Sequence, residues 1–169
     1  MTENLHVPGA KADSGKPTLR LLAEDFPHAI SFFYSMPITS GMEPAGMLRM
    51  LMLAPVDGTP VSVSVKKLLS ALTYSNPHLP QQEAQANALY AAADVAGFGM
   101  RKYTASGWKY VENGVVRYTE ALYRHLASMA SGETHDADSG RHHTSHAIWN
   151  CLAVLELLAQ VEEPAARLY

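Results

Sequence analysis

Apolar residues recur at helical spacing along most of the chain and predict a mainly helical protein. Asp25 and Pro27 are typical of a helix start, with Asp25 as the N-cap, and this helix is expected to stop before the next proline. Between residues 61 and 72 the valines also alternate as in a strand. Thr59 and Pro60 suit an N-cap and a first helical position, however, so the pattern favours a helix there.

The second half of the chain has the clearer pattern. Helices are predicted over 81–97, 115–129 and 142–161, separated by loops over 101–113 and 131–140. The first of these helices is rich in alanine and is expected to end at Gly97 and Gly99. The predicted fold is therefore all-α: one domain, 1–169, built as a bundle of about four to six helices.

Composition narrows the class of protein. Hydrophobic residues make up 47% of the 169 residues and charged residues 17%, which is too apolar for a disordered chain. A net charge of −3 argues against broad binding to nucleic acid. The single cysteine fits a reducing compartment, no apolar run reaches the ~18 residues of a membrane span, and the first residues do not resemble a secretion signal. We therefore expect a cytoplasmic protein that binds neither nucleic acid nor membrane.

Histidine is concentrated in one window, where five of the eight lie within 125–146. His143, His146 and Asn150 share one face of the last predicted helix. Two imidazoles placed in this way can share a metal ion, donate to a phosphate, or serve as acid and base. His125 falls on the apolar face of its own helix, where it is either a buried structural residue or a partner of the His143 cluster across the bundle.

Carboxylates supply a second candidate group. Glu133 and Asp136 lie three residues apart in a predicted turn, where both can converge on a hard cation such as magnesium, although acidic turns are often only solvated. Asp94 closes a polar stripe on the alanine-rich helix, and that stripe is either functional or a solvated face. The stripe consists of Glu83, Asn87, Tyr90 and Asp94.

Several short motifs occur in one order along the chain. They are Lys11-Ala12-Asp13-Ser14-Gly15-Lys16, Gly99-x-x-Lys102-Tyr103 with Trp108, Arg124-His125-Leu126, Gly132-Glu133-x-x-Asp136-x-x-Ser139-Gly140, and His143-x-x-His146 with Asn150 and Leu155-Glu156. This string resembles the phage-borne dATP/dGTP diphosphohydrolase family, which is similar in turn to the helical MazG-like nucleotide pyrophosphohydrolases. The resemblance covers residues 9–26 and about 92–158, and residues 35–80 look like an insertion in the compact family pattern.

The resemblance implies a function. A purine deoxynucleoside triphosphate, dATP or dGTP, would be cleaved to the monophosphate and pyrophosphate in phage nucleotide metabolism, in the host cytoplasm if the chain is phage-encoded. Mg²⁺ or Mn²⁺ would be held by Asp94, Glu133 and Asp136. Catalysis would involve His125, His143, His146 and Glu133. The substrate would be bound by Lys11, Asp13, Lys16, Lys102, Tyr103, Trp108, Arg124 and Asn150. MazG-like relatives are dimers or tetramers, so a homo-oligomer is expected.

The chain also departs from the MazG-like pattern, which has paired Glu-x-x-Glu and Glu-x-x-Asp motifs on two helices. Ala91 stands three residues before Asp94, and the last helix has His143 and His146 where the acids would be. One alternative is therefore a nucleotide-binding or interaction protein that kept the fold and lost catalysis. Another is an HD-type phosphohydrolase using His125 and the pair at 135–136, although no further aspartate follows Asp138.

Overall fold

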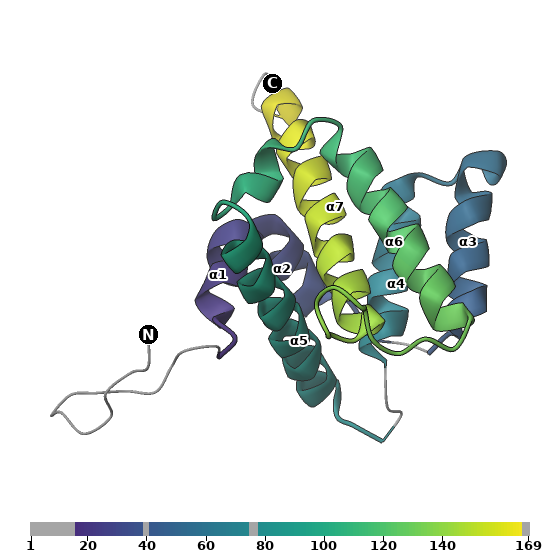
Figure 1. Ribbon diagram of the computed structural model, residues 1–169. Coiled ribbons are helices and arrows are strands. Elements are labelled where there is room, and N and C mark those ends of the chain that lie inside the picture. The colour runs from purple at the N-terminus through teal and green to yellow at the C-terminus, as the bar shows by residue number, and fades with distance from the viewer. Residues whose placement is uncertain (1–15, 39–40, 75–77, 167–169) are drawn as a thin grey trace, which may run out of the picture.

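The structure is a computed structural model that describes residues 16–38, 41–74 and 78–166, with side chains as far as Val161. Its elements are α1 Leu19–Asp25, α2 Pro27–Ser35, α3 Pro44–Asp57, α4 Val61–Thr73, α5 Gln81–Lys102, the 3-10 helix η1 Gly107–Tyr110, α6 Gly114–Ala130 and α7 His143–Ala166 (Figure 1). Within the described residues all of these elements are helices, and one isolated β-bridge joins His135 to His142. The predicted all-α fold is confirmed, with slightly more helices than expected.

Helix α7 is the centre of the bundle. It packs against α2, α4, α5 and α6, and Figure 1 shows it between them. The side chains of 151–154 are all fully buried, so this stretch of α7 has neighbours on every side. A helix that is apolar around its whole circumference can be accommodated only in the interior. The helix predicted over 142–161 is therefore the element against which the others pack.

The segment predicted to be an insertion forms α3 and α4. Helix α4 packs against α7, and α3 packs against α6. Leu51, Leu68 and Leu69 are buried in the same hydrophobic core as α7. These two helices are thus part of the central core of the protein, and whether relatives lack them stays a prediction.

Two predicted helix ends are wrong. Asp25 is the last residue of α1 and not the N-cap of the next helix, because Phe26 occupies the cap position between α1 and α2. Helix α5 runs through Gly97 and Gly99 to Lys102. Glycine lowers helix stability by only about 1 kcal/mol, and the two cations in the last turn interact favourably with the helix dipole. The longer α5 brings Lys102 to the edge of the cavity described below.

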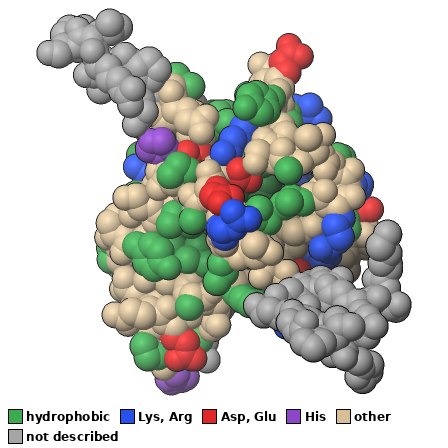
Figure 2. Space-filling model, turned by 90° about the vertical axis from the view of Figure 1, so that its left-hand side faces the viewer, with side chains coloured by type: hydrophobic (Ala, Val, Ile, Leu, Met, Phe, Trp, Pro, Cys, Tyr) green, Lys and Arg blue, Asp and Glu red, His purple; other side chains and the backbone are tan. Residues whose placement is uncertain are grey.

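The surface carries charges of both signs. On the face shown in Figure 2, Lys and Arg side chains lie among Asp and Glu side chains, and apolar side chains gather at one side. Tyr34 is among the exposed large hydrophobic residues of the protein. No helix within the described residues combines the length and apolar character needed to cross a membrane.

Candidate functional site

Three histidines meet where α6 packs against the start of α7. The Nδ1 atoms of His125 and His143 are 2.9 Å apart, which requires one proton between the two rings. The His125 and His146 rings are stacked, with centroids 4.6 Å apart. The structure therefore places His125 with the His143 cluster, which is the second of the two readings left open by the sequence.

The loop between α6 and α7 adds a carboxylate to these imidazoles. Ligand atoms of His125, Asp136 and His143 all lie within 4.8 Å of one another, and we refer to these three residues as the metal-ligand cluster. The Asp136 carboxylate accepts a hydrogen bond from the backbone N–H of Ser139 at 2.8 Å. The Ser139 hydroxyl is in turn 2.7 Å from Nε2 of His146. The loop is thus tied to α7 beside the cluster.

The charge states of the cluster suit a cation. Burial, with the neighbouring His146 and His143, lowers the pKa of His125 to about 4. Burial likewise lowers the pKa of His146, against the opposing effect of Asp136. Burial raises the pKa of Asp136, but the hydrogen bonds from Ser139 and the attraction of His146 and His125 together hold that pKa below its usual range. At neutral pH the His125 and His146 imidazoles are therefore neutral and the Asp136 carboxylate is ionised, which are the forms that bind metal ions.

His143 provides an independent sign that a cation fits. This residue is 5% exposed, and its Nε2 atom is buried with no hydrogen-bond partner. Oε2 of Glu133 approaches it to 3.5 Å without forming a hydrogen bond. Buried polar atoms almost always have partners, and an unpartnered imidazole nitrogen beside a carboxylate and a second imidazole is what a bound cation would satisfy.

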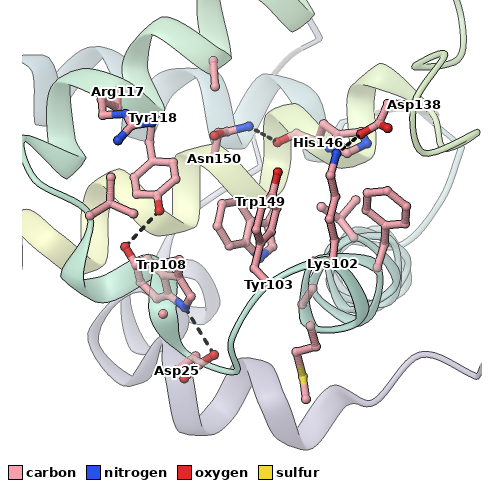
Figure 3. A pocket seen from close by; sticks show the side chains of 18 of the residues that line it. Asp25, Lys102, Tyr103, Trp108, Arg117, Tyr118, Asp138, His146, Trp149 and Asn150 are labelled. Carbon is pink, nitrogen blue, oxygen red and sulfur yellow. Dashed lines mark hydrogen bonds and ion pairs between the residues drawn. The ribbon is translucent and has the colours of Figure 1, made fainter.

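A cavity of about 810 Å³ opens beside the cluster. Its walls come from α5, η1, α6 and α7, and Figure 3 shows Lys102 and Asp138 near His146 at one end, and Trp108 and Tyr118 at the other. The polar residues of the lining include three cations, two members of the metal-ligand cluster and three other side chains: Lys102, Arg117, Arg124, His125, Asp136, Asp138, His146 and Asn150. The volume lies in the range of pockets that hold small ligands and cofactors.

The predicted substrate-binding residues are distributed unevenly around this cavity. Lys102, Tyr103, Trp108, Arg124 and Asn150 all line it. Lys102 is paired with Asp138 at 2.5 Å, and Asn150 is 4% exposed and donates to the carbonyl oxygen of His146. Tyr103 is 68% exposed.

The N-terminal candidates are separate from this group. Lys16 is exposed ahead of α1 and is not one of the cavity-lining residues. Lys11 and Asp13 lie outside the described residues.

Trp108 is held as an anchor of the loop before α6. Its ring stacks on Phe26 with centroids 4.5 Å apart, and its edge neighbours include Trp149. Its Nε1–H donates to Asp25 at 3.2 Å, and the same carboxylate accepts from Ser106 at 2.6 Å. One face of the indole is therefore covered, which leaves the exposed Tyr103 as the better placed ring for stacking on a base.

Asp94 is not brought into the metal-ligand cluster. Its carboxylate is bound by the guanidinium of Arg141, with Oδ2 2.7 Å from Nε and Oδ1 3.0 Å from Nη2. Glu133 is beside the cluster through its contact with His143, although its side chain is 62% exposed. The other three stripe residues, Glu83, Asn87 and Tyr90, are all solvent-exposed.

Sequence reasoning gave no site role to three residues that shape this region. Ser139 stands within a quoted motif, and its spacing from Asp136 is the signal that an Asp-x-x-Ser turn would give. Arg141 and Asp25 carried no local signal of a role in this site, because their partners lie far away in the sequence.

The part of the chain that holds this site matches a known protein family. A family model described as dATP/dGTP diphosphohydrolase, N-terminal, matches residues 73–167, which is more than half of the chain. No curated protein and no solved structure matches. The matched segment contains the whole metal-ligand cluster and every lining residue of the cavity except Asp25. The chain therefore belongs to the dATP/dGTP diphosphohydrolase family, through the N-terminal domain that this model describes.

Proposed function

We propose that the protein hydrolyses a purine deoxynucleoside triphosphate, dATP or dGTP, to the monophosphate and pyrophosphate, using a divalent cation held by the metal-ligand cluster. The observation that carries the proposal is the buried, unpartnered Nε2 of His143, which lies with His125 and Asp136 beside a cavity of about 810 Å³. The family to which the chain belongs supports the choice of substrate.

The cavity supplies charges that suit a triphosphate. Lys102, Arg117 and Arg124 line it, and Lys102 keeps its charge because its hydrogen bond to Asp138 raises its pKa. Cations placed around a transferring phosphoryl group stabilise the charge that develops in the transition state. The exposed ring of Tyr103 offers a face on which a purine can stack.

The reaction needs a group that accepts a proton. A water molecule attacks the α-phosphorus, the bond from that phosphorus to the bridging oxygen of the β-phosphate breaks, and pyrophosphate leaves. His146 lines the cavity and is neutral at pH 7 because burial lowers its pKa. It can therefore take the proton that the water loses, while its contact with the Ser139 hydroxyl orients the ring.

The donor set favours manganese over magnesium. A bound divalent cation would polarise the phosphoryl oxygen as a Lewis acid. Two imidazoles and one carboxylate suit Mn²⁺ better than Mg²⁺, which prefers oxygen ligands throughout. Glu133, next to His143, is placed to add another oxygen. We therefore expect Mn²⁺ to support activity at lower concentration than Mg²⁺.

The test is pyrophosphate release from each deoxynucleoside triphosphate with Mn²⁺ or Mg²⁺. We expect turnover of dATP or dGTP, and a loss of at least about 100-fold in Asp136→Asn, since a Lewis-acid cation contributes several kcal/mol. Glu24→Gln, which removes an exposed partner of Arg20, is the matched control and should leave activity unchanged. Tight binding of the nucleotide without turnover would instead identify a binding protein.

The HD-type alternative gives a different result. His135 is exposed, the centre of its ring lies 4.0 Å from that of His142, and it is not one of the three residues of the metal-ligand cluster. His135→Ala should therefore leave pyrophosphate release intact. Loss of activity in this variant, with inorganic phosphate or triphosphate as the product, would select the HD type.

The oligomeric state is a separate part of the proposal. On the resemblance to MazG-like enzymes we propose a homo-oligomer, a dimer or a tetramer. Size-exclusion chromatography with light scattering measures the mass directly, against 18.4 kDa for one chain. A monomer at all concentrations would contradict this part and leave the proposed activity unaffected.

A further inference from the structure

Arg141 ties the loop before α7 to the middle of α5. Its guanidinium binds both carboxylate oxygens of Asp94, and its Nε also donates to the backbone carbonyl oxygen of Asp94 at 3.2 Å. It lies over the Phe98 ring, 4.9 Å from the ring centre. The side chains of Arg141 and Asp94 are only 18% and 35% exposed, so solvent screens this pair less than a surface ion pair.

The same arginine organises the loop that carries Asp136. Its Nη1 donates to the carbonyl oxygen of Ser139 at 2.8 Å, and its backbone N–H donates to the Ser139 hydroxyl at 3.2 Å. Its carbonyl oxygen accepts from the backbone N–H of Asp136 at 2.8 Å. Arg141 therefore connects α5 to Asp136 of the metal-ligand cluster through a backbone hydrogen bond, and to Ser139, whose hydroxyl contacts His146 of α7.

Helix α5 is a suitable support for this connection. Ala93 and Val95, on either side of Asp94, are buried against the rest of the bundle. Asp94 therefore stands on a fixed backbone, and its carboxylate can hold a guanidinium in one place. The loop itself lies largely at the surface. A surface segment with few buried contacts costs little free energy to move, so the bonds from Arg141 help to hold this loop in place.

We infer that Asp94 is a positioning residue for cation binding: it holds Arg141, and Arg141 holds the loop so that Asp136 faces His125 and His143. Asp94 acts without touching the cation, in contrast to its predicted role as a ligand. The inference rests on the proposed function of the metal-ligand cluster. Residues that orient metal ligands typically change metal affinity by about 10- to 100-fold, and we expect about tenfold here because the effect passes through Arg141.

The experiment measures Mn²⁺ affinity without nucleotide, from the electron paramagnetic resonance signal of free Mn²⁺. The variants are Asp94→Ala, Arg141→Leu and the two combined, with Asp94→Asn as a variant of nearly unchanged shape. We expect about tenfold weaker binding in each single variant and no further loss in the double variant, because both remove the same connection. Arg20→Gln, which removes an exposed ion pair with Glu24, is the control.

Activity separates positioning from general damage to the fold. At saturating Mn²⁺ we expect kcat and the nucleotide KM of Asp94→Asn within about twofold of the wild type, while the Mn²⁺ concentration for half-maximal activity rises about tenfold. A lower kcat that Mn²⁺ does not restore, together with a lowered thermal midpoint, would show a structural role only and would overturn the inference.

The other outcomes also decide the question. Unchanged Mn²⁺ affinity in Asp94→Ala, with tight binding by the wild type, would overturn the inference and leave the proposed function standing. Additive losses in the double variant would show that Asp94 acts on the cation independently of Arg141, which also contradicts the inference. No Mn²⁺ binding by the wild type would refute the proposed metal site and the inference with it.

Discussion

Glu156 gives the sharpest test of how the fold is held together. This residue of α7 is fully buried, and its Oε2 accepts the backbone N–H groups of His28 and Ala29, each at 2.9 Å. Its Oε1 lies 2.7 Å from Nδ1 of His28. The two N–H groups belong to the first turn of α2, which has no partners for them within the helix. A carboxylate from α7 therefore caps α2, in a position that the helix dipole also favours.

The size of the effect follows from these contacts. Glu156→Ala leaves two helix N–H groups without an acceptor, and at about 1–3 kcal/mol for each unpaired buried group we expect a loss of about 4 kcal/mol. Glu156→Gln keeps one carbonyl oxygen of the same size for both N–H groups and removes the charge. We expect it to cost about 1 kcal/mol, which is the usual worth of one neutral hydrogen bond.

Urea unfolding followed by circular dichroism measures both losses, provided that the slope with denaturant is unchanged. Glu24→Gln, on the exposed surface of α1, is the control and should cost less than about 0.5 kcal/mol. If Glu156→Gln proves as damaging as Glu156→Ala, the charge and not the hydrogen bonds stabilises this junction. A cost below about 1 kcal/mol for Glu156→Ala would refute the capping argument altogether.

Three further predictions concern the site. The pKa of His125 is about 4 in the folded protein and about 6.5 when unfolded, so the unfolded chain binds more protons between these values. The contribution of His125 to the free energy of unfolding should be complete above pH 6.5 and should fall as the pH drops towards 4. Thermal midpoints measured across this range should vary less with pH in His125→Gln than in the wild type. Mn²⁺ should raise the thermal midpoint, with about 2.7 kcal/mol expected at 100 times its Kd, and an unchanged midpoint would contradict the metal site. Trp108→Phe should cost about 1 kcal/mol by removing the hydrogen bond to Asp25, and Trp108→Ala about 3–5 kcal/mol by also removing the contact with Phe26, both measured by urea unfolding.

Local patterns in the chain were enough to predict four of the helices and the region that holds the site. Helical spacing of apolar residues predicted the helices that became α4 to α7, because the pattern of an amphipathic helix is local in the chain. The concentration of histidine and acid between 125 and 146 identified the window that holds the metal-ligand cluster. Spacing along a helix shows which side chains share a face, and the two that it predicted to share one, His143 and His146, both contact His125.

The partner of each polar side chain could not be predicted from local patterns and became clear from the folded protein. Asp25, Asp94 and Glu156 are all acidic residues in or next to helices, and nothing local distinguishes them. In the folded protein one anchors Trp108, one binds Arg141, and one caps α2. A carboxylate can accept bonds from an indole, a guanidinium or a helix N-terminus alike. Which of these donors a carboxylate meets depends on how elements that are distant in the chain pack together. The spacing of residues within one helix does not reveal that packing.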